Sequence, residues 1–381
     1  MNDHDYTEFS RAFVEAVWAE VEPMAATIEE SGRIPYDRLF PLLRRMRAFG
    51  LLIPQRHGGL GLTVSQYLPL IAELAKSQGG VRALVHVHNS MAHALAAMAT
   101  DDQAEAVLPG AAVGALSVAF ALTEPDHGTG ADIGTTARRD NGKYVVNGVK
   151  HLITNSDFAS HFILFAKTAN GTTPRAVSAL LVERDTPGLR IEALPDTMGC
   201  RGGEHGRLVF EDAIVAADCL LGEEGHGLAQ MEEALEISRV FVAASSLGTA
   251  ERALELSLEY ATGRVTFGKP IAERQAVQRY LAEMATDVYA LRQMLDDAAR
   301  KWDAGRRIPA EASMCKLFGL EAAGRVTDRA LLVHGGIGYT RTFPLERLYR
   351  DARLNWLEEG TPTIQQLVIA RQLLLDRAGP R

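Results

Sequence analysis

Two neighbouring carboxylates near the C-terminus stand where a general base would be useful. The segment Glu358-Glu359-Gly360-Thr361 lies between Arg350-Asp351-Ala352-Arg353, near the end of one expected helix, and an apolar run over 364–375, which predicts the next helix. A carboxylate on a rigid turn, close to backbone N–H groups and shielded from water, suits proton abstraction. The alternative is that Glu359 and Thr361 only cap the following helix, because its first amides need acceptors.

The composition indicates a globular protein without nucleic-acid or membrane partners. With 381 residues, 47% of them hydrophobic and 23% charged, we expect two or three domains. The net charge of −8 argues against nucleic-acid binding, and no apolar run approaches the roughly 20 residues that span a bilayer. The polar, acidic start Met1–Tyr6 is unlike a targeting peptide, and three scattered cysteines predict neither disulfides nor a zinc site. We therefore expect a cytoplasmic protein.

The composition and the hydrophobic periodicity of the sequence change twice along the chain. Residues 1–117 are rich in Ala and Leu with helical periodicity, residues 118–222 contain short β-type runs, and residues 223–381 return to long helices. This order is a poor match to a doubly wound sheet. We predict an α+β fold, mainly α, with an N-terminal α-helical domain (1–117), a central β-domain (118–222) and a C-terminal helical domain (223–381). Without repeats or low-complexity linkers, the domains should pack tightly.

Local patterns place several elements within these regions. The runs 144–146, 162–165 and 177–182 predict strands, and Asn141-Gly142 and Asn147-Gly148 stand where hairpin turns are expected. In the last region, apolar residues at intervals of three and four are typical of a helix-bundle seam: Leu281, Met284, Val288, Leu291 and Leu295.

A second candidate for chemistry lies in the central region. From Phe120 to Gly130 an apolar strand enters a turn rich in glycine and hydroxyl groups, whose N–H groups can hold a phosphate. An ordinary Pro-Gly loop is the alternative. The strand that ends in Thr154-Asn155 is by itself a weak signal.

Seven short motifs, taken together, form a pattern that is specific for one protein family. They run in order along the chain: 120–129, 152–154, Met198-Gly-Cys-Arg201, 208–212, Arg264-Val-Thr-Phe-Gly268, His334-Gly-Gly-Ile-Gly-Tyr339 and 350–361. Over nearly its whole length the chain resembles the acyl-CoA dehydrogenase family of flavoenzymes. The resemblance implies a helical N-terminal domain, a central β-domain and a C-terminal four-helix bundle. It also implies FAD between the β-domain and the bundle, a homotetramer whose neighbouring subunit completes the cofactor site, and an electron-transfer flavoprotein as acceptor.

The resemblance also implies a reaction, the conversion of an acyl-CoA to its trans-2,3-enoyl-CoA. Glu359 matches the base that removes the α-proton, and flavin N5 accepts the β-hydride. The backbone N–H of Glu359 and a ribityl hydroxyl of FAD hold the thioester oxygen. Some members carry the base one residue before the arginine matched by Arg239. Here that residue is Ser238, which cannot act as the base.

The resemblance also assigns substrate and FAD contacts to further residues, each at the position that matches the family pattern. The substrate contacts are Glu236, Arg239 and Gly360, although Glu236 and Arg239 have the spacing of an ordinary surface ion pair. The alternative for Arg264 is a solvated helix end. The FAD contacts are Phe120, Leu122, Thr123, Gly128, Thr129, Leu152, Thr154, Arg264, Phe267, Gln275, Leu332, Gly335, Gly336, Thr361 and Thr363.

The sequence departs from the family pattern at four places. Gly130 follows Thr129 where Ser-Asp is usual, Leu152 replaces a tryptophan, and Leu332 replaces a glutamine. Glu358 replaces an aromatic neighbour of the base; we expect it to face solvent, the alternative being repulsion that raises the pKa of Glu359. Three histidines at 86, 88 and 93 are expected to pack or line a pocket, because their spacing does not suit a metal.

Four functions are compatible with these observations. The first is an FAD-dependent acyl-CoA dehydrogenase, and the second is a dehydrogenase that acts on an acyl carrier protein in a biosynthetic pathway. A flavin oxidase or monooxygenase on the same scaffold is the third, although such relatives often lack the carboxylate at Glu359. A scaffold protein without a cofactor is the fourth. Acyl chain length, branching and the electron acceptor stay open.

Overall fold

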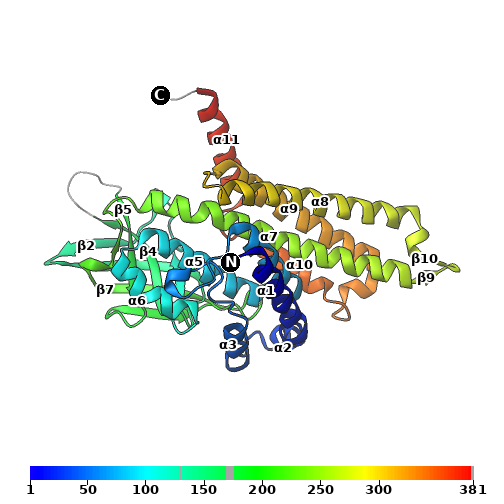
Figure 1. Ribbon diagram of the computed structural model, residues 1–381, viewed down its shortest axis with the longest axis horizontal. Coiled ribbons are helices and arrows are strands. Elements are labelled where there is room, and N and C mark those ends of the chain that lie inside the picture. Colours follow the sequence, from blue (N-terminus) through cyan, green and yellow to red (C-terminus); the bar gives the residue numbers. More distant parts are fainter. Residues whose placement is uncertain (129, 169–175, 379–381) are drawn as a thin grey trace.

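The protein consists of a helical N-terminal part, a β-sheet and a set of long helices. The computed structural model describes residues 1–128, 130–168 and 176–378. In Figure 1 the sheet occupies one end of the molecule and the long helices extend to the other, with the N-terminal helices packed beside both. The predicted fold class, α+β and mainly α, is confirmed.

The N-terminal part supplies one helix that matters for the site. Its last three helices begin at polar caps: Thr63 and Thr100 form capping boxes with Gln66 and Gln103, and the Gln78 side chain accepts from the Val81 N–H. The middle one of these three is buried over most of its length, so it is a core element. The helices are α1 (Asp3–Ala16), α2 (Glu22–Ser31), α3 (Tyr36–Arg45), α4 (Val64–Ser77), α5 (Gly79–Met98) and α6 (Asp101–Ala112).

The central sheet is mixed. Its path is β6-β7-β3-β2-β4-β5-β8; β1 and β2 both pair in parallel with β4, and the other pairings are antiparallel. Because β1 and β3 end near the helical part, they bring their last residues to the site. The strands are β1 (Val118–Ala121), β2 (Thr136–Asp140), β3 (Lys143–Thr154), β4 (His161–Thr168), β5 (Val177–Glu183), β6 (Leu189–Ala193), β7 (His205–Ala216) and β8 (Leu220–Leu221).

One of the two predicted hairpin turns is confirmed. Asn141 and Gly142 connect β2 to β3 with φ of 49° and 79°. The turn predicted at Asn147-Gly148 is wrong, because these residues lie inside β3 at a shift in its register with β7. Glycine is needed there for another reason: a Cβ on Gly148 would lie 2.6 Å from the Thr135 hydroxyl oxygen.

The long helices form the C-terminal bundle. Of the predicted seam, Leu281 is partly exposed and the other four residues are buried. A short hairpin of β9 (Val265–Thr266) and β10 (Lys269–Pro270) lies at the tip of the bundle, far from the sheet (Figure 1). The helices are α7 (Gly227–Gly263), α8 (Gln275–Asp303), α9 (Pro309–His334), α10 (Leu345–Leu354) and α11 (Pro362–Ala378).

The N-terminal helices and the bundle share one hydrophobic core. Buried side chains from α1 to α5 and from α7 to α10 form a continuous cluster, which confirms the expected tight packing. Gly248 of α7 shows how close this contact is, since an added Cβ would lie 1.9 Å from the Ala72 carbonyl oxygen of α4. A second cluster joins α5 and α6 to the sheet. Among the described residues, no helix is both long and apolar enough to cross a bilayer.

Candidate active site

A cavity of about 950 Å³ lies where the sheet meets α5, α7 and the turn between α10 and α11. It is lined by the ends of β1 and β3, by one side of α7, and by both carboxylates of the Glu358-Glu359 pair. The two stretches that the sequence singled out for chemistry, one in the central region and one near the C-terminus, therefore meet at one place.

About half of the residues that the family resemblance assigned to the site line this cavity. The central region contributes Phe120, Leu122, Thr123, Leu152 and Thr154, and the helical region contributes Glu236, Arg239, Glu359, Gly360 and Thr361. Gly128 lies on an exposed turn outside the lining, where its N–H donates to the Asp132 carboxylate at 2.8 Å. Thr129 lies outside the described residues. Thr363 is exposed on the first turn of α11 and does not line the cavity.

The remaining expected cofactor contacts gather elsewhere. Arg264 and Phe267 lie at the end of α7 and the β9–β10 hairpin, and Gln275 begins α8. Leu332, Gly335 and Gly336 lie at the end of α9, which meets the end of α7 where the rings of Tyr260 and His334 stack at 4.2 Å. All six residues are exposed, and none lines the cavity. Within one chain these two groups of expected FAD contacts are therefore separate.

The turn that carries Glu359 is held by two buried side chains. Glu359 has a left-handed backbone, with φ of 55°, and Gly360 follows with φ of 93°. Lys316 of α9 donates to the carbonyl oxygens of Glu358 and Gly360. Gln365 of α11 donates to those of Glu359 and Gly360, at 3.1 and 2.9 Å. Such contacts stabilise a backbone conformation that a residue other than glycine rarely adopts.

The Glu359 carboxylate is buried and only partly satisfied. Its Oε1 accepts from the Ser238 hydroxyl at 2.9 Å, and Ser238 accepts in turn from Ser90 at 3.0 Å. The His86 Nε2 lies 3.8 Å from the same oxygen. Within the described part of the chain, Glu359 Oε2 and both ring nitrogens of His86 have no hydrogen-bond partner. The carboxylate thus caps no helix, and one of its oxygens is free to accept a proton.

The surroundings keep this carboxylate charged. Burial raises the pKa of Glu359, but His86, the Ser238 hydroxyl and the Lys316 charge outweigh that effect and hold the pKa below its usual value. Lys316 shows the opposite balance, because burial lowers its pKa to about 8 although Glu358 and Glu359 favour its charge. An ionised carboxylate on a cavity wall at neutral pH is the state that a proton acceptor needs.

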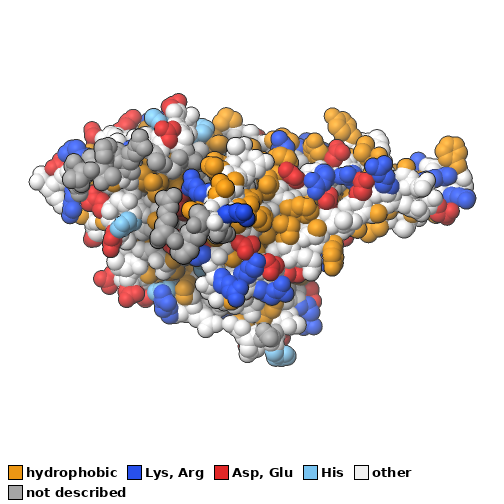
Figure 2. Space-filling model, turned by 90° about the horizontal axis from the view of Figure 1, so that it is seen from above, with side chains coloured by type: hydrophobic (Ala, Val, Ile, Leu, Met, Phe, Trp, Pro, Cys, Tyr) orange, Lys and Arg blue, Asp and Glu red, His pale blue; other side chains and the backbone are white. Residues whose placement is uncertain are grey.

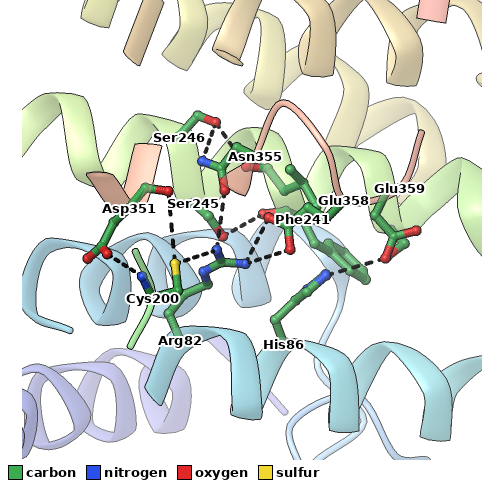
Figure 3. A network of polar contacts seen from close by, with 12 residues as sticks. Arg82, His86, Cys200, Phe241, Ser245, Ser246, Asp351, Asn355, Glu358 and Glu359 are labelled. Carbon is green, nitrogen blue, oxygen red and sulfur yellow. Dashed lines mark hydrogen bonds and ion pairs between the residues drawn. The ribbon is translucent and has the colours of Figure 1, made fainter. Parts of the chain in front are cut away.

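Glu358 does not face solvent, so that prediction is wrong. Its side chain is 16% exposed, and its oxygens accept from Arg82 of α5 at 3.1 and 3.3 Å. Figure 3 shows this guanidinium pointing at Glu358, with Asn355 and the Cys200 sulfur beside it. The opposite charge, which the sequence did not predict, attracts the carboxylate into the interior. The guanidinium compensates the negative charge of Glu358, and the pKa of Glu359 is lowered, not raised.

The predicted alternative of a surface ion pair between Glu236 and Arg239 is also wrong. Both residues are buried. Glu236 accepts from the Arg307 side chain at 2.7 Å and from the backbone N–H of Ile308, so it organises the start of α9. Burial lowers the pKa of Arg239, although Glu359 and Glu236 partly offset this. Its Nε has no partner within the described residues.

Several residues of this site were not anticipated. Arg82 and Lys316 are charged residues within apolar stretches of helices, and that pattern is the signal that could have identified them as buried and paired. Of the three histidines, His88 is a packing residue between Ser117 and the Ala111 carbonyl, whereas His86 faces Glu359. Among the described residues, no group of three or more potential ligands is placed to hold a metal.

The fold and the site agree with one protein family. Three family models match the chain: the N-terminal domain of acyl-CoA dehydrogenase at residues 3–115, its middle domain at 119–213 and its C-terminal domain at 225–374. The chain belongs to the acyl-CoA dehydrogenase family, as its motifs predicted.

Individual relatives cover almost the whole chain. It is 38% identical over 370 residues to an acryloyl-CoA reductase (NADH) of Anaerotignum propionicum, covering 96% of this chain and 93% of that protein. A butyryl-CoA dehydrogenase structure from Megasphaera elsdenii is similar with a TM-score of 0.92 at 31% identity, covering 98% and 99% of the two chains. An acyl-CoA dehydrogenase of Bacillus anthracis, complexed with FAD, has a TM-score of 0.89 at 29% identity, covering 98% and 67%.

Proposed function

We propose that this protein is an FAD-dependent dehydrogenase that converts a saturated acyl thioester, as acyl-CoA, to its trans-2,3-enoyl product. The observation that carries the proposal is the Glu359 carboxylate. It is buried, has its pKa held below the usual value, and keeps one oxygen without a partner in a cavity lined by the expected FAD contacts. A carboxylate that is ionised at neutral pH and has a free oxygen at the cavity wall can accept the proton α to a thioester carbonyl.

The residues around the cavity fit FAD. Phe120, Leu122 and Leu152 offer apolar surface for a flavin ring, and the hydroxyls of Thr123 and Thr154 offer hydrogen bonds at its edge. When bound, FAD supplies the acceptor for the hydride that leaves the β-carbon. Across a subunit interface, Arg264, Gln275 and the open Gly335-Gly336 turn would grip its ADP half, since a Cβ at either glycine would meet no atom within 4 Å.

Residues of the chain itself remove the proton, bind the thioester oxygen and orient the reacting groups. Glu359 Oε2 takes the α-proton, while the hydroxyl of Ser238 holds Oε1 in place. The backbone N–H of Glu359 binds the thioester oxygen, where it stabilises negative charge that develops as the proton leaves. Lys316 and Gln365 keep that N–H and the carboxylate oriented together. Arg239 and Gly360 lie beside the thioester.

We further propose a homotetramer, made of two dimers. Large apolar side chains are exposed at the bundle tip and on α11, including Phe267 at 96%, Tyr339 at 86% and Leu374 at 71%. Figure 1 shows α11 projecting from the body, and Figure 2 shows apolar side chains along the bundle, as a face for a second copy would require. An electron-transfer flavoprotein is the proposed acceptor and the cytoplasm the proposed location.

The decisive experiment combines a flavin spectrum with reduction by thioesters. Purified protein should carry non-covalent FAD, and butyryl-CoA should bleach it in the absence of oxygen. The same acyl group on an acyl carrier protein tests the second candidate, because only the carrier differs. Bleaching by neither thioester, with FAD bound, would overturn the proposal and favour an oxidase or monooxygenase. Protein that stays colourless after incubation with FAD would overturn the cofactor itself.

A further inference from the structure

Two carboxylates of the cavity wall are paired with basic side chains of α5. Arg82 and His86 are one turn apart on α5 and meet two consecutive carboxylates, Glu358 and Glu359 (Figure 3). His86 faces the oxygen pair proposed as the base, whereas Arg82 faces the residue beside it. The first contact belongs to the proposed chemistry, and the second is not used by it.

The Arg82–Glu358 pair is anchored from several sides. Arg82 is 2% exposed, and its Nη2 also donates to the Asn355 amide oxygen at 3.2 Å. Asn355 donates to the Ser246 hydroxyl of α7 at 2.8 Å, so the network joins α5, α7 and the segment after α10. Although burial disfavours its charge, Glu358 holds the pKa of Arg82 above the usual value. Arg82 Nη1 donates to both carboxylate oxygens of Glu358 while Nη2 is held by Asn355, so the largely buried pair has one defined geometry.

Glu358 forms part of the cavity wall, and its ion-pair partner lies behind that wall. Glu358 and Ala83 line the cavity, but Arg82, Asn355 and Cys200 do not, although they lie directly behind Glu358. The space behind Glu358 is therefore occupied by polar side chains that are hydrogen-bonded to one another.

We propose that the Arg82–Glu358 ion pair is the end wall of the acyl site and restricts the enzyme to thioesters with short acyl groups. This inference rests on the proposed function. A long alkyl chain would have to displace the guanidinium from its carboxylate. The methylene groups that it buried would contribute less than is lost when a buried charge is left without its partner.

The test is the dependence of anaerobic flavin reduction on acyl length. For the wild-type holoenzyme, kcat/KM with octanoyl-CoA should be at least about tenfold below that with butyryl-CoA, since a well-packed pocket discriminates by about tenfold or more per misfitting group. The double variant Arg82→Ala/Glu358→Ala removes both charges and opens the wall. It should raise the octanoyl-to-butyryl ratio by at least about tenfold. Arg82→Lys keeps the charge but loses the fork, and should raise the ratio less.

An ion pair between two other helices provides a matched control. Arg347 of α10 and Glu22 of α2 form an ion pair at 3.4 Å outside the cavity lining, so Arg347→Ala/Glu22→Ala should leave the ratio unchanged. Calorimetric binding of butenoyl-CoA and octenoyl-CoA to the holoenzyme reports the same preference without turnover. FAD content and flavin-monitored melting show which variants are folded.

The outcomes separate the inference from the function on which it rests. Equal reduction of the wild type by octanoyl-CoA and butyryl-CoA would overturn the wall, whether or not any variant folds. So would folded Arg82→Ala/Glu358→Ala and Arg82→Lys variants that keep the wild-type ratio. If no acyl thioester of any length reduces the wild-type flavin, the proposed function fails, and the wall fails with it.

Discussion

Ser238 and Glu359 touch, with the serine hydroxyl donating to the glutamate Oε1 at 2.9 Å. The resemblance to the family implied that some members carry their base at the position of Ser238 instead of Glu359. In this protein the two positions, 121 residues apart, point at the same spot beside the cavity. A carboxylate at either position could therefore reach the same substrate proton. The first two predictions follow from this relationship.

Glu359→Gln should retain FAD but lose flavin reduction. Glutamine keeps the size of the side chain and cannot accept the α-proton, so the reduction rate with butyryl-CoA should fall by at least ~10²-fold. Stopped-flow absorbance measures it. Glu358→Gln is the comparison: it leaves Arg82 without a carboxylate and should lower thermal stability while keeping most of the rate. Full activity of Glu359→Gln would show that this residue is not the base.

A relocated base should work in part. Glu359→Gly removes the carboxylate and suits the left-handed backbone at this position, where φ is 55°. Adding Ser238→Glu should then restore reduction well above the level of the single Glu359→Gly variant, because the new carboxylate extends from α7 into the vacated space. Stopped-flow reduction of both variants decides it. A double variant as slow as the single one, with FAD bound, would contradict the proposed equivalence.

His86→Phe should shift the pH profile of reduction upward on its acid side. His86 lowers the pKa of Glu359, so its loss raises that pKa, and a higher pH is then needed to ionise the base. The rate at high pH should change less, because Glu359 is ionised there in both proteins. Reduction rates measured from about pH 5 to 9 test this. His88→Phe, on the same helix but away from Glu359, controls for packing; an unshifted acid limb in His86→Phe contradicts the prediction.

Lys316→Met should loosen the turn that carries Glu359, the proposed base. The change leaves the carbonyls of Glu358 and Gly360 without their buried donor, and hydrogen bonds to charged groups contribute about 1.5–3 kcal/mol each. The free energy of unfolding should fall by roughly 2–4 kcal/mol, and kcat should fall more than KM changes. Denaturant titration and steady-state kinetics measure the two effects. Lys316→Arg tests whether a positive charge alone is enough to hold the turn. An unchanged kcat in Lys316→Met would show that Lys316 does not position Glu359.

Arg264→Ala should weaken FAD binding without altering the base. Arg264 is exposed at the bundle tip, so the change should cost little stability in the folded subunit. If it grips the pyrophosphate of a neighbouring subunit's cofactor, the Kd for FAD should rise by at least about tenfold, as for loss of a charge-assisted hydrogen bond. Equilibrium dialysis measures it, with Arg279→Ala as a surface control. An unchanged Kd, or a monomer with full FAD occupancy, would contradict the shared site.

Much of the protein was predictable because its signals are local. Helical periodicity depends on residues a few positions apart, so the order of helices, strands and helices and the seam of α8 could be read directly. The motif around Glu359 is also contiguous, and the structure puts it beside Phe120 and Thr123. The domain boundaries at 117 and 222 and the individual FAD contacts stay predictions.

Only the tertiary structure showed which residues surround Glu359, the proposed base. Arg82, His86, Ser238, Lys316 and Gln365 reach the turn from four different helices. Sequence periodicity says which residues face the core but not which partner each one meets there. Glu358 illustrates this: its own neighbours indicated solvent, and a buried arginine 276 residues away holds it inside. Where charges are buried, the partner decides the position of a side chain, because an unpaired charge in the interior is too costly to keep.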